Sequence, residues 1–69
     1  MHEKQITIRQ GQELANKLKK TEYQHLATEL EEMILQAVED GKRLIMLDRQ
    51  AHITAYDMFI TGYDFTLNK

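Results

Sequence analysis

The chain has 69 residues, of which 42% are hydrophobic and 29% charged, with a formal net charge of −2. This composition is typical of a folded domain rather than a disordered segment, and the length permits one small domain, residues 1–69. The absence of Cys excludes disulfides and thiolate metal sites. No apolar run is long enough to span a membrane and the polar N-terminus is unlike a signal peptide, so we expect a cytoplasmic protein.

The charges are segregated along the chain. Residues 1–20 hold five basic and two acidic residues, whereas residues 21–40 hold six acidic residues and no Lys or Arg. Residues 41–69 hold four basic and three acidic residues. Such asymmetry indicates the kind of partner a protein attracts rather than its fold.

The first third of the chain predicts a short strand over residues 4–8, followed by a helix over residues 8–20. Thr7 and Gln10 have the spacing of a capping box, which satisfies free backbone N–H groups at the start of a helix. Gly11 weakens the first turn by about 1 kcal/mol relative to alanine. Three lysines in the last turn complement the helix dipole: Lys17, Lys19 and Lys20.

The middle of the chain predicts an amphipathic helix between Thr21 and Gly41. Thr21 and Gln24 suggest a second capping box, and Gly41 suits the position after the last turn. Apolar residues recur at spacings of three and four along one side: Tyr23, Leu26, Leu30, Met33, Ile34, Ala37 and Val38. Acidic residues gather on the opposite side: Glu22, Glu29, Glu32, Glu39 and Asp40. Glu31 and Leu35 lie off both stripes.

The four consecutive apolar residues 44–47 predict a strand that is buried on both faces. Residues 48–50 suggest a turn and residues 52–54 a returning strand, which together would form a β-hairpin. An alternative interpretation is a single helix over residues 50–61 without a hairpin, because short apolar runs fit either structure.

Within the hairpin interpretation, Thr54 and Asp57 resemble a third capping pair. They would open a short helix over residues 55–61 that Gly62 closes. The alternation over residues 63–67 is typical of an edge strand.

The predicted fold is therefore α+β, with two main helices, a short β-hairpin and a short C-terminal helix or strand. A strand without a polar face is difficult to cover within 69 residues, and a second copy of the chain is the simplest cover. We thus expect a homodimer, with an interface formed by Leu44, Ile45, Met46, Leu47, Tyr56 and Phe59.

The sequence offers no catalytic, cofactor or metal site. Ser and Cys are both absent, so the usual hydrolase nucleophiles are excluded, and the three glycines are isolated, unlike a phosphate-binding loop. His25 and Glu29 have the spacing of a weak metal-binding pair, but this pattern is more typical of a solvated helix flank. We expect a protein that is not an enzyme.

The order of predicted elements resembles the small winged-helix layout of excisionase-type DNA-binding regulators. The resemblance rests on residues 6–8 and on residues 40–49, which include Gly41, Lys42 and Arg43. It implies that Arg43 and Arg49 contact phosphate around the wing. The helix that should enter the major groove, however, carries six carboxylates and no Lys or Arg, so DNA would repel it.

The acidic stripe favours a different function. A row of carboxylates from Glu22 to Asp40 spans about 27 Å and attracts a basic partner. Such a row imitates nucleic acid in the groove of a basic, nucleic-acid-binding protein, a strategy common among small acidic phage- and plasmid-encoded inhibitors. We therefore expect a small acidic regulator or inhibitor that binds a basic protein through Glu22, Glu29, Glu32, Glu39 and Asp40, without contacting membranes and with direct nucleic-acid binding as the less favoured alternative.

Overall fold

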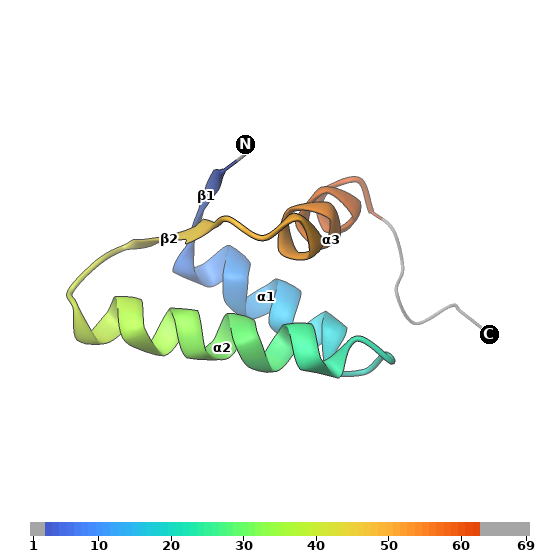
Figure 1. Ribbon diagram of the computed structural model, residues 1–69, viewed down its shortest axis with the longest axis horizontal. Coiled ribbons are helices and arrows are strands. Elements are labelled where there is room, and N and C mark those ends of the chain that lie inside the picture. Colours follow the sequence, from blue (N-terminus) through green and yellow to red (C-terminus); the bar gives the residue numbers. More distant parts are fainter. Residues whose placement is uncertain (1–2, 63–69) are drawn as a thin grey trace.

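The computed structural model describes residues 3–62 and has an α+β fold of three helices and a two-stranded antiparallel sheet (Figure 1). In chain order the elements are β1 (Lys4–Thr7), α1 (Ile8–Leu18), α2 (Gln24–Glu39), β2 (Leu44–Leu47) and α3 (Gln50–Ile60). The long helix α2 packs against α1, and β2 and α3 follow each other across the helix pair (Figure 1).

The sheet joins two segments that are far apart in the sequence. β1 pairs with β2 with Ile6 opposite Ile45 and Gln5 opposite Met46. Ile6, Ile45 and Leu47 are buried against the helices, whereas Leu44 and Met46 are exposed. The prediction that residues 44–47 are buried on both faces is therefore wrong, because one layer of helices covers only one face of the sheet.

The start of α1 confirms the predicted capping box. Gln10 N donates to Thr7 Oγ1 at 3.0 Å, and Thr7 N donates to Gln10 Oε1 at 2.9 Å. The helix ends at Leu18, two residues before the predicted end. Thr21 explains the difference, because its hydroxyl donates to the Leu18 carbonyl at 2.7 Å and turns the chain.

Gly11 marks a close approach between α1 and the rest of the core. A Cβ at this position would lie 2.9 Å from Ile45 Cδ1 and 3.3 Å from Ile34 Cδ1. A single methyl group requires only a small shift of the Ile45 side-chain tip, and the higher helix propensity of alanine offsets it.

We therefore expect Gly11→Ala to be nearly neutral and Gly11→Val to lower the free energy of unfolding by about 1–3 kcal/mol. Urea unfolding of both variants measures the difference. A valine variant as stable as the wild type would contradict this account of the contact.

The second helix differs from prediction at its start and agrees with it at its end. Thr21 accepts from Tyr23 N at 3.0 Å instead of capping with Gln24, so the predicted second capping box is wrong. Gly41 has a φ of 73° directly after the helix. Gly41 N donates to Val38 O and Lys42 N donates to Ala37 O, which is the Schellman arrangement that favours glycine at this position.

The last described element is one helix, α3, and the alternative interpretation of residues 50–61 is confirmed. The hairpin, the returning strand at residues 52–54 and the short helix starting at residue 55 are wrong. The helical spacing of His52, Ile53 and Tyr56 buries all three, and the segment lacks a tight-turn sequence. Gly62 follows the helix with a φ of 89°, and the predicted edge strand at residues 63–67 lies outside the described residues.

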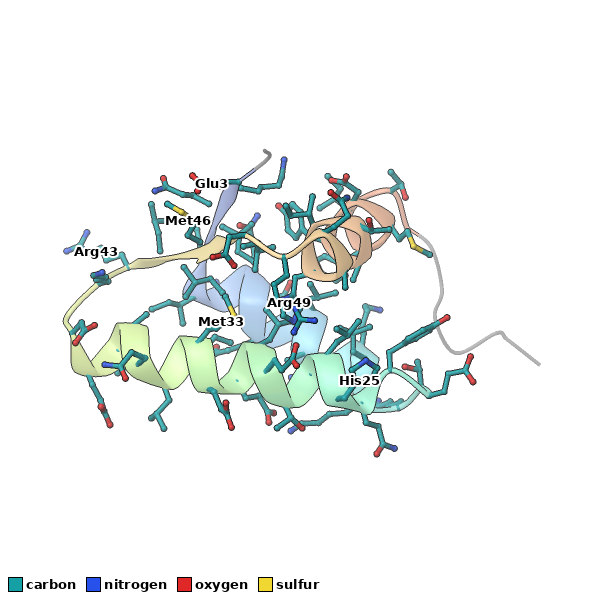
Figure 2. All side chains as sticks on the ribbon, in the orientation of Figure 1. Glu3, His25, Met33, Arg43, Met46 and Arg49 are labelled. Carbon is teal, nitrogen blue, oxygen red and sulfur yellow. The ribbon has the colours of Figure 1, made fainter. Side chains whose placement is uncertain are left out.

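The core lies between the two long helices, the inner face of the sheet and α3. Its buried apolar residues come from every element, and the largest fully buried ones are Ile6, Leu14, Leu18, Leu30 and Leu47. Figure 2 shows Met33 extending from α2 toward β2 and Arg49 extending from the start of α3 toward α2. Within residues 3–62, no helix is both long and apolar enough to cross a membrane.

Candidate functional site

The exposed side of α2 carries the carboxylates that the sequence predicts as a binding surface. Glu32 and Glu39 are both exposed, and their separation of seven residues places them on the same side of the helix, about 10 Å apart along its axis. Asp40 follows at the exposed end of the helix and accepts from Gln36 Nε2 at 3.3 Å. Glu22 is exposed in the segment before α2.

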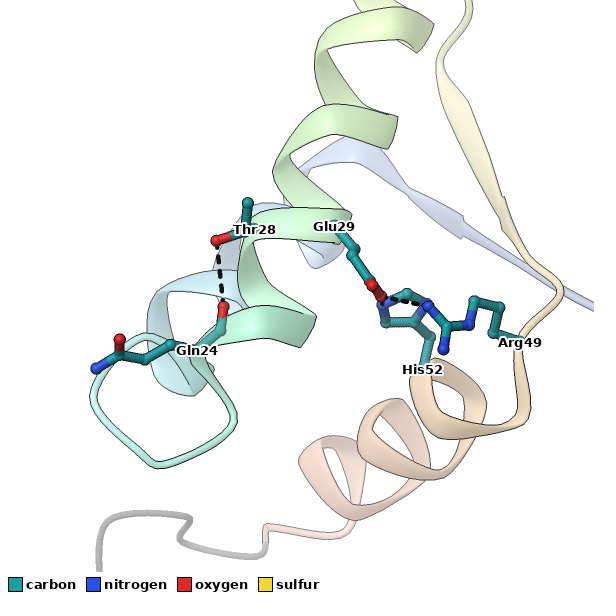
Figure 3. A network of polar contacts seen from close by, with 5 residues as sticks. All are labelled: Gln24, Thr28, Glu29, Arg49 and His52. Carbon is teal, nitrogen blue, oxygen red and sulfur yellow. Dashed lines mark hydrogen bonds and ion pairs between the residues drawn. The ribbon is translucent and has the colours of Figure 1, made fainter.

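Glu29 is also on α2, but a residue of the same chain neutralises it. Arg49 Nη1 lies 2.6 Å from Glu29 Oε1, and His52 Nε2 lies 3.3 Å from the same oxygen (Figure 3). The Glu29 side chain is only 39% exposed. The Glu29 carboxylate therefore links α2 to the start of α3, and Glu29 does not belong to the free acidic surface.

A second carboxylate of this helix is paired on the opposite flank. Glu31 Oε2 lies 2.5 Å from Lys19 Nζ, which connects α2 to the end of α1. Two of the six acidic residues at positions 21–40 thus have basic partners. The remaining four, which make no ion pair with any of residues 3–62, are called the acidic row below: Glu22, Glu32, Glu39 and Asp40.

His52 is a buried polar residue of this region that the sequence did not single out. It is 1% exposed, and neither ring nitrogen has a hydrogen-bond partner of acceptable geometry. Burial lowers the pKa of His52 below its ordinary value of 6.5, and the nearby Glu29 carboxylate opposes this effect. The sequence signal for this cluster is the three-residue spacing of Arg49 and His52. If residues 50–61 are helical, this spacing places both side chains on one side of the helix.

The predicted dimer interface divides into core and surface. Ile45, Leu47 and Tyr56 are buried within their own chain, where they belong to the core. Phe59 is half-buried and packs against the same core. Leu44 and Met46 remain 43% and 42% exposed, and they alone of the six form an open apolar surface.

The geometry does not support a metal site or a wing. Among the described residues, no group of three or more His, Asp and Glu side chains converges as a metal site would require. Glu29 contacts His52 and Arg49, and His25 is exposed. The winged-helix layout is not formed, because the segment expected to supply the wing is α3 and Arg49 is held by Glu29.

Comparisons with models of protein families, with curated proteins and with solved structures found no match for this chain.

Proposed function

We propose that this protein is a non-enzymatic regulator or inhibitor, and that it binds a basic protein through the acidic row. The observation that carries the proposal is the exposure of Glu32 and Glu39 on one side of α2 with no basic partner within residues 3–62. Most exposed helix faces mix charges of both signs. A single-sign face speeds encounter with an oppositely charged partner.

The rigidity of α2 favours nucleic-acid mimicry as the mode of inhibition. The helix has 16 residues and is anchored by five buried residues and by ion pairs on both flanks. The backbone positions of the carboxylates are thereby held at fixed spacing, so the helix backbone loses little conformational entropy on binding. A fixed row of negative charges suits a groove that binds phosphates, so a basic nucleic-acid-binding protein is the proposed target.

The proposal includes a homodimer, because a domain of 69 residues has a small core and leaves Leu44 and Met46 exposed. Dimerisation would present two copies of the acidic row. A second copy of the row raises the apparent affinity for a partner with two basic sites, without any new contact.

Reversal of charge on α2 tests the acidic row. We expect Glu32→Lys/Glu39→Lys to abolish capture of basic proteins from host lysate, and we expect capture by the wild type to weaken steeply as salt screens the attraction. The matched control is Glu3→Lys/Glu13→Lys, which makes the same change in net charge at two exposed acidic residues elsewhere.

The control variant should keep the captured protein. Equal loss in both double variants would show that only net charge matters, and the acidic row would then have no specific role. Circular dichroism of each variant establishes that the fold is intact. Binding of the wild type to duplex DNA in a gel shift would contradict the mimicry proposal and favour the DNA-binding alternative.

A further inference from the structure

The strand β2 has a free edge. The sheet of the described residues contains only β1 and β2, so one side of β2 has no backbone partner among residues 3–62. A groove of about 260 Å³ lies beside β2, lined by Met33, Gln36 and Ala37 of α2, by Asp40 directly after this helix and by residues 42 and 44–46. The helix therefore leaves room beside the strand.

The pairing of β1 with β2 shows which backbone groups point toward this free edge. Residues that face each other in an antiparallel ladder alternate between pairs that exchange hydrogen bonds and pairs that do not. Ile8 N donates to Arg43 O at 3.3 Å, and Thr7 lies opposite Leu44. The Thr7–Leu44 and Gln5–Met46 pairs are therefore the ones that do not exchange bonds, so the backbone N–H and C=O groups of Leu44 and Met46 point away from β1.

The same two residues expose their side chains on the outer face of the sheet. An exposed apolar edge strand is a template for pairing with another strand. A sheet of only two strands is also marginal, and three or more strands with an apolar face are more stable. Both features favour the addition of a strand at this edge.

We propose that β2 pairs antiparallel with β2 of a second copy of the chain, forming a continuous four-stranded sheet across a two-fold axis. The inference rests on the homodimer of the proposed function and identifies its interface. A strand that pairs with its own copy gives an isologous, closed contact, which is the commonest form of homodimer.

The positions of the free backbone groups limit the register. Leu44 and Met46 must lie opposite residues that also direct their backbone groups outward, and a two-fold axis at Ile45 achieves this for both. Leu44 then faces the partner's Met46, so the exposed apolar side chains cover each other on one face. In this register Lys42 lies beside the partner's Asp48, and the two-fold axis repeats this pair of opposite charges at each end of the new pairing.

A charge swap tests this register. Lys42→Asp and Asp48→Lys each place like charges side by side at both ends of the interface, and we expect each to weaken dimerisation about tenfold at low salt. The double variant Lys42→Asp/Asp48→Lys restores opposite charges and should recover the wild-type dissociation constant. Lys20→Asp and Asp57→Lys are the matched controls, because they change exposed residues elsewhere and should leave dimerisation unchanged.

Cross-linking provides a second measurement that does not depend on charge. The chain has no Cys, so introduced thiols react without competition. Facing residues that exchange hydrogen bonds have Cα atoms about 5.5 Å apart, which suits a disulfide. We expect an equimolar mixture of Leu44→Cys and Met46→Cys to form cross-linked dimers on mild oxidation, and Leu35→Cys, exposed on α2, to remain monomeric in denaturing gels.

The outcomes separate the register from the broader proposal. A dimer by light scattering that tolerates each single charge change and forms no 44–46 cross-link would overturn the β2 interface and leave the homodimer intact. A monomer at about 100 µM without cross-links would overturn both, whether the edge stays open or another segment covers it. Capture by the acidic row is measured separately, so its failure affects neither conclusion.

Discussion

Replacement of Leu30 by alanine is expected to lower the free energy of unfolding by about 2–5 kcal/mol. Leu30 lies at the centre of α2 and is 0% exposed, so the truncated side chain leaves a cavity between the helix pair and the rest of the core. A domain of this length has a total stability of roughly 0.05–0.15 kcal/mol per residue. The variant should therefore retain little stability, which urea unfolding followed by circular dichroism measures.

Leu35→Ala is the matched control for this prediction. Leu35 is on the same helix, five residues further along, and is 60% exposed. Its replacement removes the same atoms from a largely solvated position, so we expect a change within about 0.5 kcal/mol. Equal effects of the two substitutions would mean that α2 does not bury the face that the structure assigns to the core.

The elements that the sequence predicts correctly have local signals. The Thr7–Gln10 capping box and the glycine at position 41 act within one helical turn, and both are formed as expected. The apolar period of α2 also identifies its buried face, since Leu26, Leu30, Ile34 and Ala37 are all in the core. Tyr23 and Val38 belong to the same apolar set but remain exposed, because they lie at the margins of the packed face.

The errors concern residues whose structure depends on distant contacts. The apolar run 44–47 forms a strand that pairs with β1, but it alternates between core and surface because the described helices cover only one face of this sheet. Residues 50–60 form a helix because helical spacing places His52, Ile53 and Tyr56 against the core. For so short a segment, the spacing of apolar residues does not distinguish a helix from a strand.

The acidic surface is predicted from charge counts and from the spacing of carboxylates along one helix, and neither includes partners from distant elements. Arg49 is 20 residues from Glu29 in the sequence, and yet it provides the nearest charge. The free negative charge of α2 is therefore smaller than the number of its carboxylates. The four residues of the acidic row have no ion pair among residues 3–62, and their role in binding stays a prediction.

The buried His52 makes a distinct prediction about pH. Because burial lowers the pKa of His52 in the folded state below its ordinary value of 6.5, the unfolded chain binds a proton at a pH where the folded chain does not. Stability is therefore unaffected by His52 well above pH 6.5 and decreases as the pH falls below this value, until the folded-state pKa is reached. The slope that one proton contributes is at most about 1.4 kcal/mol per pH unit.

Substitution of each histidine isolates this effect from the carboxylates. We expect the free energy of unfolding of the wild type to fall between pH 7.5 and about 5 more steeply than that of His52→Gln, measured by urea unfolding at each pH. His25→Gln changes an exposed histidine and should keep the wild-type slope. Parallel profiles for the wild type and His52→Gln would show that His52 takes up its proton equally in both states.

Substitution of Glu29 should change the pKa of His52 in a known direction. The Glu29 carboxylate favours the protonated imidazole, whereas Arg49 opposes it and Asp48 supports it more weakly. Glu29→Gln removes the largest group that raises the pKa of His52 and leaves Arg49 beside the ring. The folded-state pKa should then fall further, so the acid-dependent loss of stability should extend to lower pH than in the wild type, in pH-dependent unfolding and in NMR titration of the ring.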